Sequence, residues 1–411
     1  MKKIFFAFFL ISSLAHAGGF QITSLSQRSN AMGGCSMALP PEVGHVYFNP
    51  GAFAFVKQKC FYIGTSLIIP STEYVAPAPS TYSARTVNQV FTPFGLYANY
   101  RKENSKLNFG LGIYTPFGSG TKWKDDWAGQ FIIQQINLQV IFVQPTVGYQ
   151  INDNIGVGLG VVYSFGNVLL RQAIPVQDVY AVGSAKLQGK ANGFGFNAGV
   201  YYQGMSCKDP CGKKLRAGLS YRSGVNMKAK NGTATFSVPS SLANYFPNTT
   251  FNGNIKLPAL LNLGVGYSFS EKIFLTAEIN YAFWSVFDSL KFDYAQNTTK
   301  LLDTRTPRLY KNSMTYRVGF CYKKNEKIKL MAGMDYDVTP AHADYITPDL
   351  PDANRFGISG GISYTHNKVE LLFALEYIKT GAHFGNNAEA NFSGTYQTKA
   401  IVPGVGISYK F

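Results

Sequence analysis

The last eight residues of the chain alternate between two kinds of side chain, and this period constrains the fold more than any other feature. The odd positions of residues 404–411 are all apolar: Val405, Ile407, Tyr409 and Phe411. The even positions are small or polar: Gly404, Gly406, Ser408 and Lys410. Because successive side chains of a strand point to opposite faces, one face suits lipid and the other a polar lumen. The pattern predicts the wall of a transmembrane β-barrel.

Alternating segments of this kind recur through most of the chain. Short polar turns such as residues 152–154 alternate along the chain with long connections such as residues 71–86, 231–255 and 295–312. An even number of strands joined in this way is typical of a closed bacterial barrel with its short turns in the periplasm. We therefore predict an all-β fold, a 14-stranded antiparallel transmembrane β-barrel over residues 57–411. Its expected strands are 57–69, 87–100, 106–117, 132–150, 155–170, 193–203, 215–230, 256–269, 273–294, 314–323, 327–338, 355–365, 369–380 and 396–411.

Residues 1–17 have the layout of a secretory signal peptide. Lys2 and Lys3 precede an apolar run over residues 4–14, and Ala-His-Ala at 15–17 offers a cleavage site. No later stretch approaches the roughly 20 apolar residues of a membrane-spanning helix. An aromatic content of 15% suits the girdles of a barrel at its two membrane interfaces. We expect a multi-pass protein of the bacterial outer membrane.

Residues 18–56 do not follow the strand pattern. They are rich in Gly, Ser and Pro and contain only short apolar pieces. A separate domain of this length would struggle to bury a core by itself. A barrel of fourteen strands is otherwise an open aqueous pore, so we expect this segment to fold inside the lumen as a hatch, or plug.

The net charge of +16 falls by two, to about +14, if Lys2 and Lys3 leave with the signal peptide. Such an excess can attract anionic lipid head groups or an anionic substrate. Nucleic acid is the competing partner of basic proteins, but the sequence has no basic helix or dense Lys/Arg run, so we expect no nucleic-acid binding.

Two of the five cysteines lie close together. A turn at residues 207–211 (Cys-Lys-Asp-Pro-Cys) would allow a local Cys207–Cys211 disulfide in an oxidising compartment. Cys35, Cys60 and Cys321 have no evident partners, and a bridge between Cys35 and Cys60 stays open. The spacing is not that of a metal site, and we expect no metal or other cofactor.

Residues 357–361 fit the hydrolase pattern G-x-S-x-G around Ser359, but they lie inside an alternating strand rather than at a strand-to-helix elbow. His342 and Asp344 provide too few ligands for a metal. We therefore predict that the chain is not an enzyme.

Several short pieces resemble, in order, the FadL family of outer-membrane transporters for long-chain fatty acids and other hydrophobic compounds. Residues 18–22 (Gly-Gly-Phe-Gln-Ile) are similar to the opening of the family, and residues 46–51 (Val-Tyr-Phe-Asn-Pro-Gly) resemble its plug motif, usually written Asn-Pro-Ala. Further similar pieces occur at 196–199, 219–223, 257–258, 281–285, 316–317, 348–349 and 355–356. The resemblance covers essentially the mature chain.

This resemblance implies a fourteen-stranded barrel with an N-terminal hatch, capture of the substrate at an extracellular hydrophobic groove, and a deeper site near the hatch N-terminus. It also implies exit sideways through a gap in the wall, without an energy source. We expect a monomer that passively imports long-chain fatty acids or similar compounds. An aromatic hydrocarbon channel of the same architecture is the nearest alternative, ahead of a general porin or an outer-membrane lipid hydrolase.

A fatty acid needs an apolar path for its tail and a cation or amide donors for its carboxylate. Phe20 is the candidate for tail contact, with ordinary packing in the hatch as its alternative. Strand alternation places Arg317 in the lumen, and Lys311 shares its parity, so both are candidate head-group cations. A lumenal ion pair with Asp or Glu is the alternative for each.

Two similar pieces, residues 92–95 and 115–118, should lie on adjacent strands. Proline cannot donate to the ladder, so Pro93 and Pro116, with Phe117 and Gly118, are candidates for a lateral opening in the wall. An ordinary strand end beside a loop is the alternative. Trp123 and Trp127 are candidates for the outer capture surface or for an interfacial anchor.

Asn49 and Pro50 are the candidate gating latch of the hatch, because Asn side chains bond locally to backbone and Pro restricts the chain. Asn-Pro is also a common turn. Gly51 departs from the usual alanine of the family and should make this turn more flexible. As partners we expect outer-membrane lipid and lipopolysaccharide, and the barrel assembly machinery, which would recognise the C-terminal Phe411.

Overall fold

The computed structural model describes residues 18–177, 182–206 and 213–411. The predicted signal peptide and the predicted Cys207–Cys211 pair lie outside these residues. Within them, twenty-one strand segments form one antiparallel sheet. No helix in the described ranges is long and apolar enough to cross a membrane.

The first eight segments lie in the first half of the chain. They are β1 (Cys60–Ser66), β2 (Ile69–Val75), β3 (Ser83–Arg85), β4 (Phe94–Tyr100), β5 (Leu107–Lys122), β6 (Gln135–Gln150), β7 (Ile155–Gln177) and β8 (Val182–Ser206). The next eight are β9 (Lys213–Arg222), β10 (Val225–Ser237), β11 (Thr249–Leu257), β12 (Leu260–Ser268), β13 (Ile273–Ala282), β14 (Ser289–Tyr294), β15 (Thr304–Pro307) and β16 (Ser313–Lys323). The last five are β17 (Ile328–Asp337), β18 (Arg355–His366), β19 (Val369–Thr380), β20 (His383–Asn387) and β21 (Phe392–Lys410).

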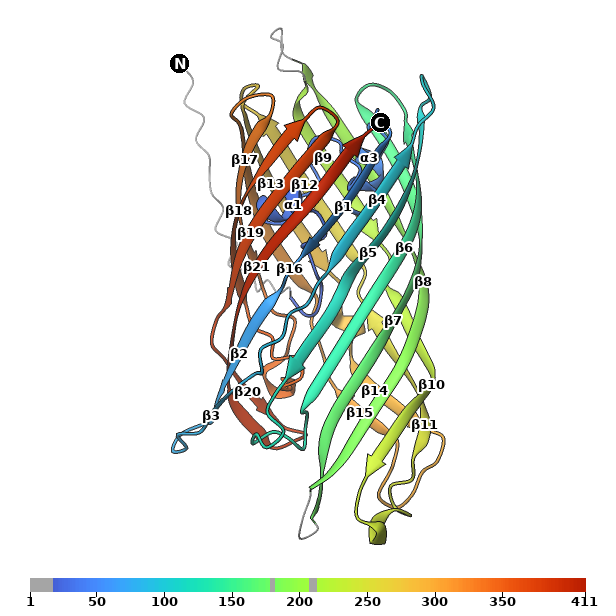
Figure 1. Cartoon of the computed structure of the whole chain (residues 1–411), viewed down its shortest axis with the longest axis vertical. Coiled ribbons are helices and arrows are strands. Elements are labelled where there is room, and N and C mark those ends of the chain that lie inside the picture. The colour runs from blue at the N-terminus through green and yellow to red at the C-terminus, as the bar shows by residue number, and fades with distance from the viewer. Residues whose placement is uncertain (1–17, 178–181, 207–212) are drawn as a thin grey trace.

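These segments make fourteen strands of a closed barrel, which confirms the predicted fold. Seven of the fourteen consist of two segments separated by a short break: β1/β2, β3/β4, β9/β10, β11/β12, β13/β14, β15/β16 and β19/β20. The ring closes where β21 pairs with β1, from Cys60↔Lys410 to Ser66↔Gly404, as well as with β19. Figure 1 shows the tilted strands around a long axis.

The two faces of each strand differ as the alternation predicts. On β13, Leu275 and Ile279 point outward and are exposed, whereas Thr276, Glu278 and Asn280 point inward and are buried. Short turns join the strands at the end of the barrel where the chain terminates, including residues 151–154, 269–272 and 324–327. Short turns mark the periplasmic end of bacterial barrels.

The predicted long connection at residues 231–255 is wrong in part, and the expected strands 155–170 and 193–203 are too short. Residues 171–177 and 182–192 continue the β7–β8 hairpin, and residues 231–237 and 249–255 continue β10 and β11. These stretches extend the sheet beyond the membrane, where both faces carry polar side chains or pack on other parts of the protein, so a lipid-facing alternation does not identify them. Figure 1 shows β10, β11, β14 and β15 at the end opposite the chain terminus.

Residues 18–56, here called the N-terminal segment, contain three short helices: α1 (Gln27–Ala31), α2 (His45–Phe48) and α3 (Pro50–Phe53). Elsewhere in the described ranges there are three single-turn 3-10 helices: η1 (Ser240–Leu242), η2 (Trp284–Val286) and η3 (Ala343–Tyr345). In Figure 1 α1 and α3 lie within the ring of strands, toward the periplasmic end.

The N-terminal segment contacts inward-facing groups on well-separated strands. The Gly33 N–H donates to Ser359 Oγ of β18 at 2.9 Å, and Asn49 Nδ2 donates to the Val200 carbonyl of β8 at 3.1 Å. Gly33 has a φ of +67°, and a Cβ on it would lie 2.6 Å from the Met334 carbonyl oxygen. Only glycine fits this close approach to β17. The segment therefore spans the lumen.

Candidate ligand-binding site

Phe20 lies near the start of the N-terminal segment, in a cluster of aromatic rings. Its side chain is 4% exposed. It meets Trp284 edge-on with ring centroids 4.8 Å apart, Phe287 at 5.5 Å and Phe117 at 6.1 Å. Such edge-to-face contacts stabilise the arrangement beyond simple burial. The predicted tail-contact residue is therefore placed in an apolar environment made by β5 and the break between β13 and β14.

The wall is irregular beside this cluster. β5 pairs regularly with β6 as far as Tyr114↔Phe142 and resumes at Phe117↔Val140, so Thr115 and Pro116 together face Ile141. This is a bulge with one extra residue. On its other side, β5 pairs with β4 only as far as Gly95↔Tyr114, because β4 begins at Phe94, directly after Pro93. On this side, residues 115–121 of β5 have no partner strand in the wall, and at the end of β5 the Val87 N–H donates to the Lys122 carbonyl at 2.7 Å.

The N-terminal segment pairs with the freed edge of β5. The Ile22 N–H donates to the Pro116 carbonyl at 2.9 Å, and the Gly118 N–H donates to the Phe20 carbonyl at 3.0 Å. Gln21 and Phe117 form an isolated antiparallel bridge. The sequence prediction of a loosened wall at Pro93, Pro116, Phe117 and Gly118 falls at this interruption.

A cavity of about 340 Å³ lies along the inside of the interruption and of the neighbouring strands β19 and β21. Phe20 and Ile22 line it from the N-terminal segment, and Phe91, Pro93 and Phe117 line it from the interrupted wall. The neighbouring strands β19 and β21 contribute Ile378, Ala400 and Val402. This volume lies at the small end of ligand pockets, and the lining is mostly apolar, as ligand pockets usually are.

The lining of this cavity includes one arginine, Arg355 of β18, and one carboxyl group, that of Glu376. Arg355 Nη2 donates to the Gly19 carbonyl at 3.0 Å, and the Gly19 N–H donates to Asp352 Oδ2 at 2.9 Å. Arg355 also lies 3.3 Å from Asp337 and 3.7 Å from Asp352. Gly19, the residue before Phe20, is thus held through its carbonyl by Arg355 and through its N–H by Asp352.

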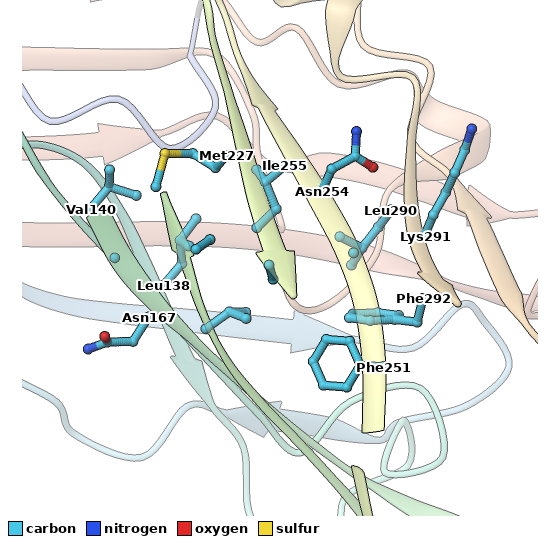
Figure 2. Close-up of a pocket in the computed structure, with 15 residues that line it drawn as sticks. Leu138, Val140, Asn167, Met227, Phe251, Asn254, Ile255, Leu290, Lys291 and Phe292 are labelled. Atoms are coloured by element: carbon cyan, nitrogen blue, oxygen red, sulfur yellow. The ribbon is translucent and has the colours of Figure 1, made fainter. Parts of the chain in front are cut away.

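A second apolar pocket lies on the inner wall, farther toward the extracellular end. Figure 2 shows Leu138, Val140 and Met227 facing Phe251, Leu290 and Phe292 across it. The space between these side chains measures only about 20 Å³, so a hydrocarbon chain would enter only if they moved apart. Val140 and Met227 belong to the same buried cluster as Phe20, and Leu138 lines both this pocket and the 340 Å³ cavity. The apolar lining is continuous from one to the other.

The two cations predicted for the head group lie elsewhere. Arg317 points into the lumen as the alternation predicted, but its Nη1 forms a buried ion pair with Glu278 at 3.2 Å. Glu278 also accepts the Ser36 and Met37 N–H groups at 2.7 and 2.9 Å. Arg317 therefore helps to anchor the N-terminal segment. Lys311 precedes β16 and is exposed, and its backbone N–H donates to the Pro340 carbonyl at 2.9 Å.

Sequence reasoning missed Arg355 and Arg222 as possible anion-binding residues. Arg222 is buried, donates to Tyr114, to Gln144 and to the Tyr47 carbonyl, and lies 4.5 Å above the Tyr47 ring. It has no ion pair with any described residue. Both arginines occur in pieces that resemble the FadL family, at 219–223 and 355–356, so the motif positions were the available signal.

Asn49 begins α3 and sits in a narrow slot of the wall. Its Oδ1 accepts the Gly51 N–H at 2.9 Å, and its amide contacts β8 as described above. A Cβ on Gly199 would lie 2.2 Å from Asn49 Oδ1. Gly51 is helical, and a Cβ on it would lie 2.7 Å from the Tyr201 nitrogen. The glycine thus permits close packing of α3 on the wall, which differs from the flexible turn that we expected.

Trp123 and Trp127 do not form an exposed surface. They are 0% and 2% exposed and stack on each other with centroids 4.3 Å apart. Trp123 Nε1 donates to the Pro348 carbonyl, and Trp127 Nε1 donates to the Ile133 carbonyl. Their burial places them in the packed core of the extracellular loops, and excludes a lipid-facing anchor in this conformation.

The cysteines, Ser359 and His342 were also candidates in the sequence. Cys35, Cys60 and Cys321 are free thiols, so the structure does not contain the Cys35–Cys60 bridge that the sequence left open. Ser359 lies inside β18 and not at a strand-to-helix elbow, and its hydroxyl accepts a hydrogen bond from the N-terminal segment. His342 begins η3 and lies 3.5 Å from Asp344, and no metal-binding group of three or more ligands occurs in the described ranges.

A family model decides the relationship of this chain to known proteins. Residues 8–411 match the outer membrane protein transport protein family (OMPP1/FadL/TodX). The chain belongs to this family. Its location is therefore the bacterial outer membrane, as the sequence predicted.

Individual members of the OMPP1/FadL/TodX family are similar over most of their length. The long-chain fatty acid transport protein of Escherichia coli K12 is 24% identical over 400 residues, covering 87% of each chain. A Pseudomonas aeruginosa FadL homologue has the same fold, with a TM-score of 0.83, 17% identity, and coverage of 96% of this chain and 100% of its own. The Pseudomonas putida toluene transporter TodX gives a TM-score of 0.72 at 18% identity, covering 95% and 99%.

Proposed function

We propose that this chain passively imports long-chain fatty acids or similar hydrophobic compounds across the outer membrane. The observation that carries the proposal is the 340 Å³ cavity, which reaches from Phe20 to the interruption of the wall at Pro93 and Pro116. An apolar compound bound there lies beside the one place where β5 lacks a neighbouring strand. Family membership supports transport, and the name of the Escherichia coli relative supports fatty acids as the substrate class.

The proposed path begins at the extracellular apolar pocket and continues along the buried cluster to Phe20. The continuous lining through Leu138 and Val140 supports this order. The compound then leaves sideways, between β5 and the residues around Phe91, into the hydrocarbon of the membrane. Lateral exit suits a hydrophobic compound because it never has to cross the aqueous periplasmic end of the lumen.

Arg355 replaces Lys311 and Arg317 as the proposed partner of a carboxylate head group. It lines the cavity and already donates to the Gly19 carbonyl. A carboxylate accepts stronger hydrogen bonds from a guanidinium than a carbonyl does. Binding would therefore compete with the Gly19 contact and release the residues that pair with the β5 edge.

Gating then belongs to the N-terminal segment, which we propose acts as the hatch. Residues 20–22 would leave the β5 edge when ligand binds, while Asn49 and Pro50 keep the segment attached to β8. This arrangement allows local movement without loss of the whole segment, and it needs no energy source or cofactor.

A second candidate is an aromatic hydrocarbon as the cargo. Phe117, Trp284 and Phe287 surround Phe20 edge-on, an arrangement that an aromatic ring could also join. Arg355 already faces two carboxylates, so the cavity has no surplus positive charge that demands an anion. The name of the TodX relative supports this class of compound.

We further propose that the chain is a monomer without catalytic activity, and that the barrel assembly machinery recognises Phe411 during insertion. A porin function is less well supported, because the N-terminal segment occupies the lumen. A lipid hydrolase would require Ser359 as nucleophile, although its hydroxyl accepts a backbone bond from Gly33. Loss of hydrolysis in Ser359→Ala would favour the hydrolase.

The test is uptake of labelled oleate by cells that lack their own fatty-acid transporter, with and without this chain. We expect protein-dependent uptake, and about tenfold less with Phe20→Ala, since a loss of only ~1.4 kcal/mol of binding has that effect. Phe384→Ala is the matched control, because Phe384 lies in β20 and is 52% exposed. No uptake of oleate by a folded barrel would refute the fatty-acid proposal, and uptake of toluene by the same cells would support the second candidate.

A further inference from the structure

The extracellular part of the wall has two chemically different faces. Its inner face lines the apolar pocket of Figure 2, whereas the side chains of Asn254 and Lys291 point outward, away from that pocket. The same alternation applies to β8, β10, β11, β14 and β15, whose outward charged residues are all exposed. The outward cations of these five strands, here called the cationic face, are Lys186, Lys190, Lys228, Lys230, Lys256, Lys291 and Arg305.

Cross-strand register brings members of this face together. Lys228 of β10 lies opposite Asn192 of β8 and opposite Asn254 of β11. Asn254 in turn lies opposite Lys291 of β14, and Lys291 lies opposite Arg305 of β15. One row of the sheet therefore carries Lys228, Lys291 and Arg305, with Asn254 between Lys228 and Lys291 and no residue between Lys291 and Arg305.

Little negative charge balances the cationic face. The five strands contain one acidic residue, Asp293. Asp288, directly before β14, makes loose contacts of 3.9 Å to Lys256 and 3.8 Å to Arg305. Among the described residues, Lys190, Lys228 and Lys291 form no ion pair. Like charges held close together on one sheet repel one another, so an anionic partner would stabilise them.

The cationic face begins where the lipid-facing band ends. On β8, Phe196 and Phe194 point outward and are 43% and 71% exposed, and Asn192 and Lys190 follow on the same face. Two residues along a strand span about 7 Å. Phe194 lies 5.1 Å from Tyr163 and Phe196 lies 5.9 Å from Tyr221, so these rings form an aromatic belt around this side of the barrel. Such belts lie at the head-group level of a membrane.

This geometry points to a binding surface for the phosphorylated head groups of lipopolysaccharide. We infer that acyl chains pack on the aromatic belt while the phosphates of lipid A meet the row that contains Lys228 and Lys291. The outer leaflet of the bacterial outer membrane presents these phosphates directly above its hydrocarbon. Basic residues near an anionic membrane surface are attracted to it. Binding at this surface is independent of the compound that the lumen carries.

The test compares the affinity of the purified full-length protein for labelled lipopolysaccharide with that of Lys190→Gln/Lys228→Gln/Lys291→Gln. We expect at least about tenfold weaker binding by the variant. Lys324→Gln/Lys327→Gln/Lys368→Gln is the matched control, because these exposed lysines lie in turns at the periplasmic end. The control should bind like the unchanged protein. Heat-modifiable migration in gels verifies that each barrel is folded, and the single variant Lys228→Gln should show a several-fold loss if the triple variant is not recovered.

Two further arms identify the ligand chemistry. The unchanged protein should bind dephosphorylated lipopolysaccharide about as weakly as the triple variant binds native lipopolysaccharide. Inorganic phosphate alone should not displace the lipid. Equal affinity of the triple variant and the unchanged protein would overturn the inference. So would an equal loss in the control, unchanged binding of dephosphorylated lipid, or displacement by inorganic phosphate.

Discussion

At the scale of residues, Arg355 connects the cavity to the start of the N-terminal segment. Arg355→Gln should lower oleate uptake about tenfold, since a charge-assisted hydrogen bond contributes ~1.5–3 kcal/mol. Uptake of toluene should change little, because a neutral hydrocarbon needs no cation. Labelled oleate and toluene, measured in the same cells, would separate the two effects.

Two variants control for the change at Arg355. Arg355→Lys keeps the positive charge beside Asp337 and Asp352 and should recover part of the oleate uptake. Arg85→Gln removes an exposed arginine that pairs with Glu73 and should have no effect. Equal losses of oleate and toluene uptake in Arg355→Gln would indicate a structural role, because removing one partner of a partly buried ion pair leaves the other charge unpaired and destabilises a protein.

Asn49 is the second residue whose role can be tested by a single change. Asn49→Ala removes the cap of α3, which contributes ~1 kcal/mol, and the bond to the Val200 carbonyl. We expect reduced oleate uptake with normal amounts of folded barrel in the membrane. Asn325→Ala removes a similar local cap at a periplasmic turn and should leave uptake unchanged. Normal uptake by Asn49→Ala would show that Asn49 is not a latch.

At the scale of elements, the bulge of β5 controls the proposed exit. Deleting Pro116 would join the registers Tyr114↔Phe142 and Phe117↔Val140 into one regular ladder and keep Phe117 facing inward. We expect slower oleate uptake, because the straightened edge closes the place where a ligand leaves. Uptake rates per folded barrel are the measurement.

The barrel offers a matched bulge away from the cavity. β10 shifts register by one residue between Ala229 and Gly232, against both of its neighbours. Deletion of Asn231 should regularise that strand and leave the β5 edge unchanged, so uptake should fall much less than after deletion of Pro116. An unchanged rate after deletion of Pro116, or an equal decrease after deletion of Asn231, would argue against lateral exit at β5.

At the scale of the whole molecule, the N-terminal segment separates a closed barrel from an open pore. Removal of residues 18–56 should leave a wide lumen that conducts small ions in a planar bilayer, since fourteen strands enclose more space than their own side chains fill. The full chain should conduct far less. Similar conductance of the two proteins would favour a general porin over a gated transporter.

The sequence by itself determined the barrel. Each strand must present apolar side chains to lipid and small or polar ones to the lumen, and this requirement is local, so residues such as Leu275, Glu278 and Ile279 reveal their faces individually. The same parity correctly placed Arg317 in the lumen. The motif at residues 18–22 likewise directed attention to Phe20, and the prolines at 93 and 116 to the interrupted wall.

Only the tertiary structure decided which groups meet inside. Glu278 lies directly opposite Arg317 on the neighbouring strand and forms an ion pair with it, whereas Arg355 reaches Gly19, which is more than three hundred residues away in sequence. The stacked pair Trp123 and Trp127 is buried by loops whose packing follows no period. Contacts of this kind depend on barrel closure and on the path of the N-terminal segment, which bring distant residues together without leaving a periodic signal in either stretch of sequence.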